Sequence, residues 1–152
     1  MKKAWITMSL IVFVLSVCSP VFAAGHIAGK ETTYSADGLT MKGFLIYNKE
    51  IEGKRPGVLV VHEWWGHNEY VRKRAMMLAE MGYTALAVDM YGDGKQAAHP
   101  DNAKQFAAEV MKDAETGEKR FNAALAFLKK QNNVDPEAIA AIGYCFGGGV
   151  VL

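Results

Sequence analysis

A cysteine near the end of the chain lies in a pattern typical of a catalytic nucleophile. The run Gly143–Gly147, which reads Gly-Tyr-Cys-Phe-Gly, follows directly on the apolar segment 138–142. A strand that runs into Gly-x-nucleophile-x-Gly predicts a sharp strand-to-helix turn, the nucleophile elbow, here with Cys in place of Ser. A Cβ atom two residues before or after the nucleophile would collide with neighbouring backbone, so both glycines are required. The amide groups that open the next helix would point toward a substrate at Cys145.

The first 23 residues have the composition of a secretory signal peptide. Lys2 and Lys3 precede an apolar stretch of about 14 residues, which is followed by small residues at Val21 and Ala23. This order predicts export and cleavage after Ala23. The apolar stretch is shorter than the ~20 residues that a membrane-spanning helix needs. We therefore expect no membrane span and a periplasmic or secreted protein.

Removal of this leader would leave Cys145 as the only cysteine and a nearly balanced charge. Two lysines and no acidic residue would be lost, so 15 basic residues would face 16 acidic ones. This balance excludes the broad basic surface of a nucleic-acid-binding protein. An intrachain disulfide would be impossible, and an unpaired thiol in an oxidising compartment favours a reactive cysteine. Segment 15–18 also resembles a lipoprotein box, but Val17 stands where Gly or Ala is expected, so lipid anchoring at Cys18 is less favoured.

Alternating strand and helix patterns predict an α/β fold for residues 24–152. The expected strands cover residues 31–34, 39–47, 57–61, 84–88 and 138–142. The last three are continuous apolar runs, as buried parallel strands should be. Helices are expected over 69–81, with Asn68 as the N-cap, and over 102–130, where Gly117 interrupts the helical pattern. The order predicts a mostly parallel sheet with helices on both faces.

Residues that can do chemistry follow three of the expected strands. His62 and Glu63 follow the first apolar run, segment 89–93 with two aspartates follows the second, and Cys145 follows the third. The carboxyl ends of parallel strands meet at one edge of a sheet, where active residues of such folds gather. The sequence therefore predicts one site built from all three segments.

From Gly57 to its end the chain resembles the dienelactone hydrolase family of α/β-hydrolases. The resemblance rests on the runs His-Glu-Trp-Trp-Gly at 62–66, Asp-Met-Tyr at 89–91 and Gly-Tyr-Cys-Phe-Gly-Gly at 143–148. It implies an α/β-hydrolase fold of which residues 24–152 form the N-terminal part of a single domain. It also implies cleavage of a small-molecule ester or lactone, without a cofactor or metal, by a protein that is monomeric when full length.

The same resemblance implies a role for each matching residue. Cys145 would attack the ester carbonyl and form an acyl-thioester that water then hydrolyses. Glu63 would help to convert the resting thiol to the thiolate, which is the attacking species. The main-chain N–H groups of Phe146 and Trp64 would form the oxyanion hole. The substrate pocket would be lined by Trp64, Trp65 and Tyr91.

Two features differ from the family pattern. The family's catalytic Asp and His follow the nucleophile in chain order, and the chain ends at Leu152. We therefore expect this chain to be inactive by itself and its last strand to expose an aggregation-prone edge. Dienelactone hydrolases also carry a carboxylate-binding Arg two residues after the tyrosine of the Asp-x-Tyr segment. Asp93 occupies that position here and favours a neutral ester or lactone.

Two other motifs are incomplete in this sequence. The run His62-Glu63-x-x-x-His67 is one residue too long for the zinc motif His-Glu-x-x-His, and segment 92–95 lacks the glycine spacing and hydroxyl residue of a phosphate loop. We expect structural roles for His62, His67 and His99. A secreted, non-catalytic binding domain stays open as an alternative. A thioesterase or acyltransferase also stays open, because it would use the same thioester intermediate.

Overall fold

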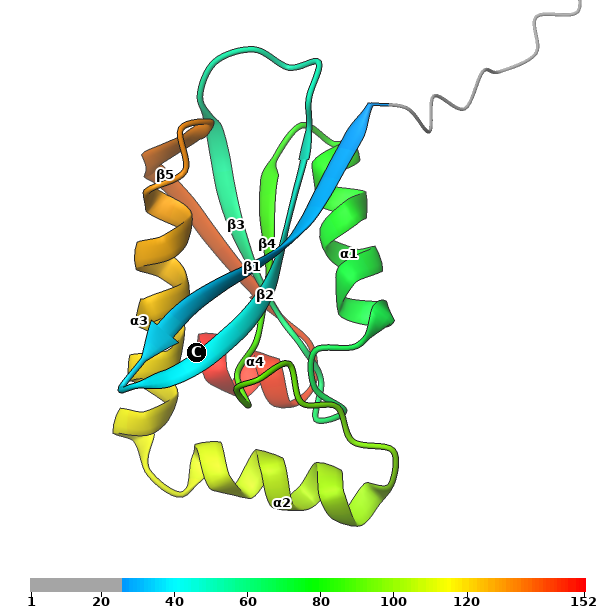
Figure 1. Ribbon diagram of the computed structural model, residues 1–152, viewed down its shortest axis with the longest axis vertical. Coiled ribbons are helices and arrows are strands. Elements are labelled where there is room, and N and C mark those ends of the chain that lie inside the picture. Colours follow the sequence, from blue (N-terminus) through cyan, green and yellow to red (C-terminus); the bar gives the residue numbers. More distant parts are fainter. Residues whose placement is uncertain (1–25) are drawn as a thin grey trace, which may run out of the picture.

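The computed structural model describes residues 26–152, so the predicted leader, with Cys18, lies outside the described residues. The described part forms five strands and four helices (Figure 1). The strands are β1 (Ile27–Ala36), β2 (Leu39–Asn48), β3 (Arg55–Val61), β4 (Thr84–Val88) and β5 (Val134–Gly143). The helices are α1 (Glu69–Glu80), α2 (Pro100–Met111), α3 (Ala114–Lys129) and α4 (Phe146–Val151). Asn68 caps α1 through its side chain, as predicted.

The strands form one mixed sheet in the order β1-β2-β4-β3-β5. β1 and β2 form an antiparallel hairpin, and β2 is also antiparallel to β4. β3 runs parallel to both β4 and β5. The predicted parallel arrangement therefore holds for the three strands that precede the candidate site. Their carboxyl ends lie at one edge of the sheet, where α4 begins (Figure 1).

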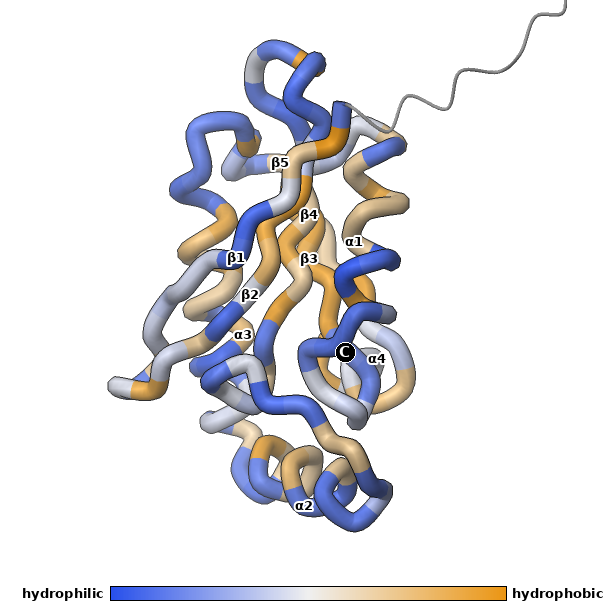
Figure 2. The backbone as a smooth tube through the Cα atoms, turned by 45° about the vertical axis from the view of Figure 1, so that its right-hand side comes forward, coloured by the Kyte–Doolittle hydropathy of each residue, from blue (hydrophilic) through white to orange (hydrophobic). Residues whose placement is uncertain are grey.

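Helices cover both faces of the sheet, as predicted. On one face, Val71, Ala75 and Ala79 of α1 pack against β3 and β4. On the other face, Val110 of α2 and Leu128 of α3 belong to a second core cluster. Every residue of β4 is buried, because this strand has helices on both sides. Figure 2 shows the apolar stretch that runs along β3 and β4 through the middle of the molecule.

The long helical region breaks at a different place from the predicted one. α2 and α3 are separated at residues 112–113, whereas Gly117 lies inside α3. The Asp113 carboxylate accepts a hydrogen bond from the Glu115 N–H at 3.0 Å and so caps α3. A side-chain cap satisfies an amide group that the start of a helix leaves without a partner, and it therefore stabilises a helix start at Asp113. The cost of a single glycine inside a helix is small enough for Gly117 to be accommodated within α3.

β5 begins before the predicted strand. The Asn, Asp and Pro residues of segment 132–136 favour a turn, but Val134 already pairs with Arg55 of β3. The register then shifts between Pro56 and Gly57, and residues 136–138 bulge out of the ladder. A bulge accommodates Pro136, which has no N–H to donate to a neighbouring strand. β5 is the outermost strand on its side of the described sheet.

Candidate active site

Three loops meet at the carboxyl edge of the parallel strands, and their aromatic side chains form one cluster. The His62 ring, after β3, lies edge-on to Tyr91, after β4, with ring centroids 4.6 Å apart. It also stacks on Phe146, after β5, at 5.7 Å and an interplanar angle of 18°. Tyr91 and Phe146 are themselves 5.4 Å apart. The predicted convergence of the three strand ends is confirmed.

The backbone at Cys145 has the strained form of a nucleophile elbow. Cys145 has φ of 53° and ψ of −114°, a conformation that residues other than glycine rarely adopt. A Cβ on Gly143 would lie 2.0 Å from the Gly147 carbonyl oxygen, and a Cβ on Gly147 would lie 2.6 Å from the His62 carbonyl oxygen. Both glycines are therefore sterically required, as predicted. The Cys145 side chain is exposed at the edge of the sheet.

The residues on either side of Cys145 are held in place. Gly147 donates its N–H to the Tyr144 carbonyl at 2.9 Å, which closes the turn. The Tyr144 hydroxyl accepts hydrogen bonds from Arg74 Nε at 3.0 Å and Nη2 at 2.8 Å, which link the elbow to α1. Phe146 is the first residue of α4, so its N–H has no acceptor within the helix. The elbow thus leaves the N–H of the residue that follows Cys145 without an acceptor in the helix.

The loop after β3 supplies Glu63, Trp64 and Trp65, which are all half-buried. The Glu63 carbonyl accepts hydrogen bonds from His62 Nδ1 and from the Gly66 N–H, the latter at 3.2 Å. The two indole rings pack edge to face with centroids 5.2 Å apart. Within residues 26–152 the Glu63 carboxylate forms no ion pair. Glu63 is therefore not tied to a structural partner and does not hydrogen-bond Cys145.

His62 is 1% exposed, and both of its ring nitrogens have backbone partners. Nε2 accepts a hydrogen bond from the Met90 N–H at 3.2 Å, while Nδ1 bonds to the Glu63 carbonyl. Burial lowers the pKa of His62 from its ordinary 6.5 to about 4, because desolvation disfavours the charged ring. His62 therefore has a structural position and is not free to act as a base for Cys145.

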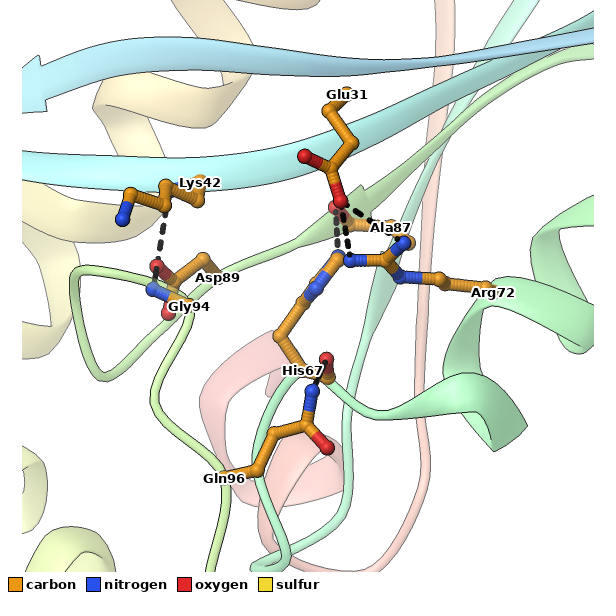
Figure 3. Close-up of polar contacts among 8 residues, drawn as sticks. All are labelled: Glu31, Lys42, His67, Arg72, Ala87, Asp89, Gly94 and Gln96. Carbon is orange, nitrogen blue, oxygen red and sulfur yellow. Dashed lines mark hydrogen bonds and ion pairs between the residues drawn. The ribbon is translucent and has the colours of Figure 1, made fainter.

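Asp89, which follows β4, organises the loop 89–94 through four backbone amides. Its Oδ1 accepts hydrogen bonds from the N–H groups of Tyr91 and Gly92, both at 2.9 Å. Its Oδ2 accepts from the N–H groups of Lys42 at 2.9 Å and Gly94 at 2.8 Å (Figure 3). The carboxylate thus joins β2 to the loop and determines where Tyr91 lies.

Tyr91 connects the end of β4 to the loop after β3. Its hydroxyl donates to the Trp64 carbonyl at 3.0 Å, and the residue is only 2% exposed. Burial raises the pKa of Tyr91 above its ordinary value of 10, and the nearby Cys145 adds to the rise. The hydroxyl therefore stays protonated and keeps donating at neutral pH. Tyr91 lies near Cys145, with little ring surface left for a substrate.

A second group of contacts joins the same loops to the sheet. The buried His67 bonds through Nε2 to the Ala87 carbonyl of β4 at 3.2 Å, and its own carbonyl accepts from Gln96 Nε2 at 3.0 Å (Figure 3). Burial lowers the pKa of His67 as well. Beside it, Arg72 of α1 pairs with Glu31 of β1 at 3.2 Å (Figure 3). His67 is structural, as predicted.

One supporting residue of the site is absent from the sequence prediction. Arg120 of α3 is buried and donates from Nη1 to the Met90 carbonyl at 2.8 Å. It shares the buried face of α3 with Ala124 and Leu128. Residues four and eight positions apart lie on one side of a helix, so this spacing is the signal that marks Arg120 as facing the core.

Replacing Asp89 with Ala is expected to lower the free energy of unfolding by about 3 kcal/mol or more, because four amide groups would lose a charged acceptor. Chemical denaturation measures the difference. Asp93→Asn is the matched control, since Asp93 is exposed in the same loop and Asn tolerates its φ of 54°. An Asp89→Ala variant as stable as the Asp93→Asn variant would contradict the role of Asp89.

Neither a metal centre nor a membrane helix is found in residues 26–152. No three His, Cys, Asp or Glu side chains in that range gather as a metal site requires. No helix of the described part is both long enough and apolar enough to cross a membrane. The rings of His62 and His67 bond to backbone groups of β4 and its following residues, which argues further against a zinc motif.

The chain matches known proteins in sequence and in fold. The model of the dienelactone hydrolase family matches residues 41–152. A relative from Aquifex aeolicus named as a carboxymethylenebutenolidase is 28% identical over 128 residues, which are 82% of this chain and 54% of the relative. The solved structure of m3DLH is 35% identical with a TM-score of 0.80, over 84% of this chain and 53% of that one. The dienelactone hydrolase-like promiscuous phosphotriesterase P91, from metagenomic libraries, is 33% identical with a TM-score of 0.79 and the same coverage.

The match extends over the whole candidate site. It begins within β2 and runs to the last residue, so it includes the three loops and the elbow. The structural neighbours confirm the predicted α/β-hydrolase fold. The chain spans about half the length of the curated relatives and solved structures named above. On these grounds the chain belongs to the dienelactone hydrolase family.

Proposed function

We propose that the complete protein hydrolyses a small-molecule ester or lactone through a thioester on Cys145. The observation that carries this proposal is the exposed Cys145 at a strained elbow whose flanking glycines are both sterically required. Strain of this kind gathers at functional sites, since a structural cysteine has no need of it. Family membership supports ester or lactone hydrolysis in general, and another relative, from Bradyrhizobium, is named as a lactonase.

The proposed chemistry has two stages. The Cys145 thiolate attacks the carbonyl carbon, a C–S bond forms, and the oxyanion that results collapses as the C–O bond to the leaving group breaks. Water then cleaves the thioester, which releases the acid and restores the thiol. The N–H groups of Phe146 and Trp64 would stabilise the oxyanion, and the loss of one such donor typically costs on the order of 10²–10³ in rate.

Glu63 is proposed to assist the formation of the thiolate. A free thiol has a pKa of about 8.5, so only a minority is ionised at neutral pH. The Glu63 carboxylate is half-buried in the loop that faces the elbow and has no ion-pair partner in the described residues. It is therefore available to accept the thiol proton once a substrate or a side-chain rotation brings the two groups together.

The charge of the loop after β4 supports a neutral substrate. Asp93 is exposed in that loop, and a carboxylate there repels an anionic substrate. The half-buried rings of Trp64 and Trp65 would provide apolar surface for the acyl or alcohol group. We propose that Tyr91 contributes to the pocket mainly by holding Trp64 in place.

We also propose that the protein is exported. The leader-like residues 1–23 support a periplasmic or secreted location.

None of the four histidines hydrogen-bonds Cys145: His62 and His67 bond to backbone groups, His99 caps α2, and His26 pairs with Glu50. We propose that the Asp and His of the triad lie outside residues 26–152 and that this chain alone stops at the thioester.

A burst experiment tests this proposal on the chain as it stands. Mixed with p-nitrophenyl acetate, the chain should release about one equivalent of p-nitrophenolate and then very little, because acylation needs only the thiolate and the later hydrolysis needs a base. Peptide mass spectrometry should place one acetyl group on Cys145. The Cys145→Ala variant should show no such burst.

The Cys145→Ala variant also controls for the other cysteine, Cys18, which it retains. A burst of equal size in this variant would refute Cys145 as the nucleophile. Sustained, enzyme-like turnover by the wild-type chain would refute the proposed source of the base. A Cys145 that is neither acylated nor alkylated until the protein unfolds would instead favour the non-catalytic binding domain.

A further inference from the structure

His62 lies between the two segments that would supply the oxyanion hole. Its ring stacks on Phe146, and its own carbonyl oxygen faces Gly147, where an added Cβ would lie only 2.6 Å away. Along the chain it is followed directly by Glu63 and Trp64. Each of the two candidate oxyanion donors, the N–H groups of Phe146 and Trp64, therefore belongs to a segment in contact with His62.

The hydrogen-bond partners of His62 determine which ring nitrogen carries the proton. Nε2 lies 3.2 Å from the Met90 N–H, and a backbone amide can only donate, so Nε2 must be the unprotonated acceptor. Nδ1 then carries the proton and donates it to the Glu63 carbonyl, which can only accept. Burial lowers the pKa of His62 to about 4, which keeps this neutral form over the whole neutral range.

The carbonyl that His62 holds is part of the peptide group that contains the Trp64 N–H. A trans peptide is planar, and its C=O and N–H point in opposite directions. Anchoring the Glu63 carbonyl through His62 Nδ1 and the Gly66 N–H, the latter at 3.2 Å, therefore fixes the direction of the Trp64 N–H. The next peptide is also anchored, because the Tyr91 hydroxyl donates to the Trp64 carbonyl at 3.0 Å.

We propose that His62, as the Nδ1–H tautomer, is a positioning residue that couples the Met90 amide to the Glu63–Trp64 peptide and so preorganises the Trp64 N–H as an oxyanion donor. The consequence for rate rests on the proposed function, whereas the tautomer does not. An oxyanion hole is effective because its donors are in place before the charge develops. His62 does not touch the substrate and acts only through the orientation of this peptide.

Two matched variants separate the two hydrogen bonds of the ring. In His62→Asn, the side-chain amide nitrogen stands close to the position of Nδ1 and can still donate to the Glu63 carbonyl, while the Met90 bond is lost. In His62→Gln, the longer side chain reaches the position of Nε2 and can still accept from the Met90 N–H, while the Glu63 bond is lost. A merely structural role of the ring predicts similar damage from both changes.

The readout compares two reactions of the same thiol. Acylation of Cys145 by p-nitrophenyl acetate passes through an oxyanion, whereas alkylation by iodoacetamide does not. The ratio of the two rate constants, measured on variants that are fully folded, therefore reports the oxyanion hole, independently of thiol ionisation or exposure. We expect this ratio to fall at least 10-fold in His62→Gln and by less than about 3-fold in His62→Asn. A ratio that falls equally in both variants, or in neither, would overturn the inference.

Nitrogen-15 NMR of the wild-type chain tests the tautomer without any reaction. We expect His62 to show a protonated Nδ1 and an unprotonated Nε2 at pH 7. The opposite tautomer or an imidazolium ring would overturn the inference even if Cys145 is readily acylated. If Cys145 of the wild-type chain is alkylated but never acylated, this result would count against the proposed function. In that case the His62 tautomer measured by NMR would decide by itself whether His62 holds the Glu63 peptide.

Discussion

Replacing Gly143 with Ala should prevent the elbow from forming and lower the free energy of unfolding by on the order of 4 kcal/mol or more. A Cβ at this position would lie 2.0 Å from the carbonyl oxygen of Gly147, a separation that no real Cβ contact has. The obstacle is backbone and not the end of a flexible side chain, so it can be relieved only by moving β5 or α4. Chemical denaturation and the far-UV circular dichroism of the purified variant measure the loss.

Two further glycines of the same run make this experiment internally controlled. A Cβ on Gly147 would meet the His62 carbonyl oxygen at 2.6 Å, so Gly147→Ala should also be strongly destabilising. A Cβ on Gly149 would meet nothing within 4 Å. Gly149→Ala should be neutral or stabilising by about 0.5–1 kcal/mol, because Ala is the better helix former. If Gly143→Ala and Gly149→Ala are equally stable, the elbow geometry described above is wrong.

The folded chain should lose roughly 3 kcal/mol of stability as the pH falls from 6.5 to 4, because of His62. Burial holds the pKa of His62 at about 4 in the folded state, against an ordinary value of 6.5. Between these two values the unfolded chain binds a proton that the folded chain does not, so stability decreases with falling pH. The stability stops depending on this group about one pH unit above 6.5, and no further loss comes from it about one pH unit below 4.

Urea denaturation at a series of pH values measures this loss. His67 should add to it, because burial lowers its pKa as well. His99→Asn is the control for the loss of a histidine: His99 is exposed and caps α2, and Asn is also a good N-cap, so this variant should be about as stable as the wild type at neutral pH. A wild-type stability that is constant from pH 6.5 to 4 would show that His62 is accessible to protons in the folded state.

Much of the candidate site could be predicted from short stretches of sequence. The elbow at Cys145 depends on glycines two residues before and after it, and the structure shows the clashes that a Cβ would cause at both. Residues 57–61 of β3 and most of β4 are apolar, so the burial of these strands and the position of the loops that follow them were predictable. These features depend on residues that are neighbours in sequence or on a regular pattern of apolar residues along the chain.

Other features depended on competing local signals and were predicted less well. The boundary between α2 and α3 lies at 112–113 because Asp113 supplies a cap, while Gly117 is accommodated within α3. The start of β5 at Val134 depends on pairing with β3, and pairing overrode the turn signals of residues 132–136. In both cases a contact with another group outweighed the intrinsic preference of a single residue.

By itself the sequence determined the glycines of the elbow at Cys145, the order of strands and helices, and the three strand ends that form the candidate site. Only the tertiary structure decided how the site is held together. It brings His62 to the Met90 amide, 28 residues away, and the Tyr91 hydroxyl to the Trp64 carbonyl, 27 residues away. These bonds join side chains to backbone groups of other segments. The partners in these bonds come close to each other only when the sheet has formed. They therefore cannot be predicted from a local sequence pattern.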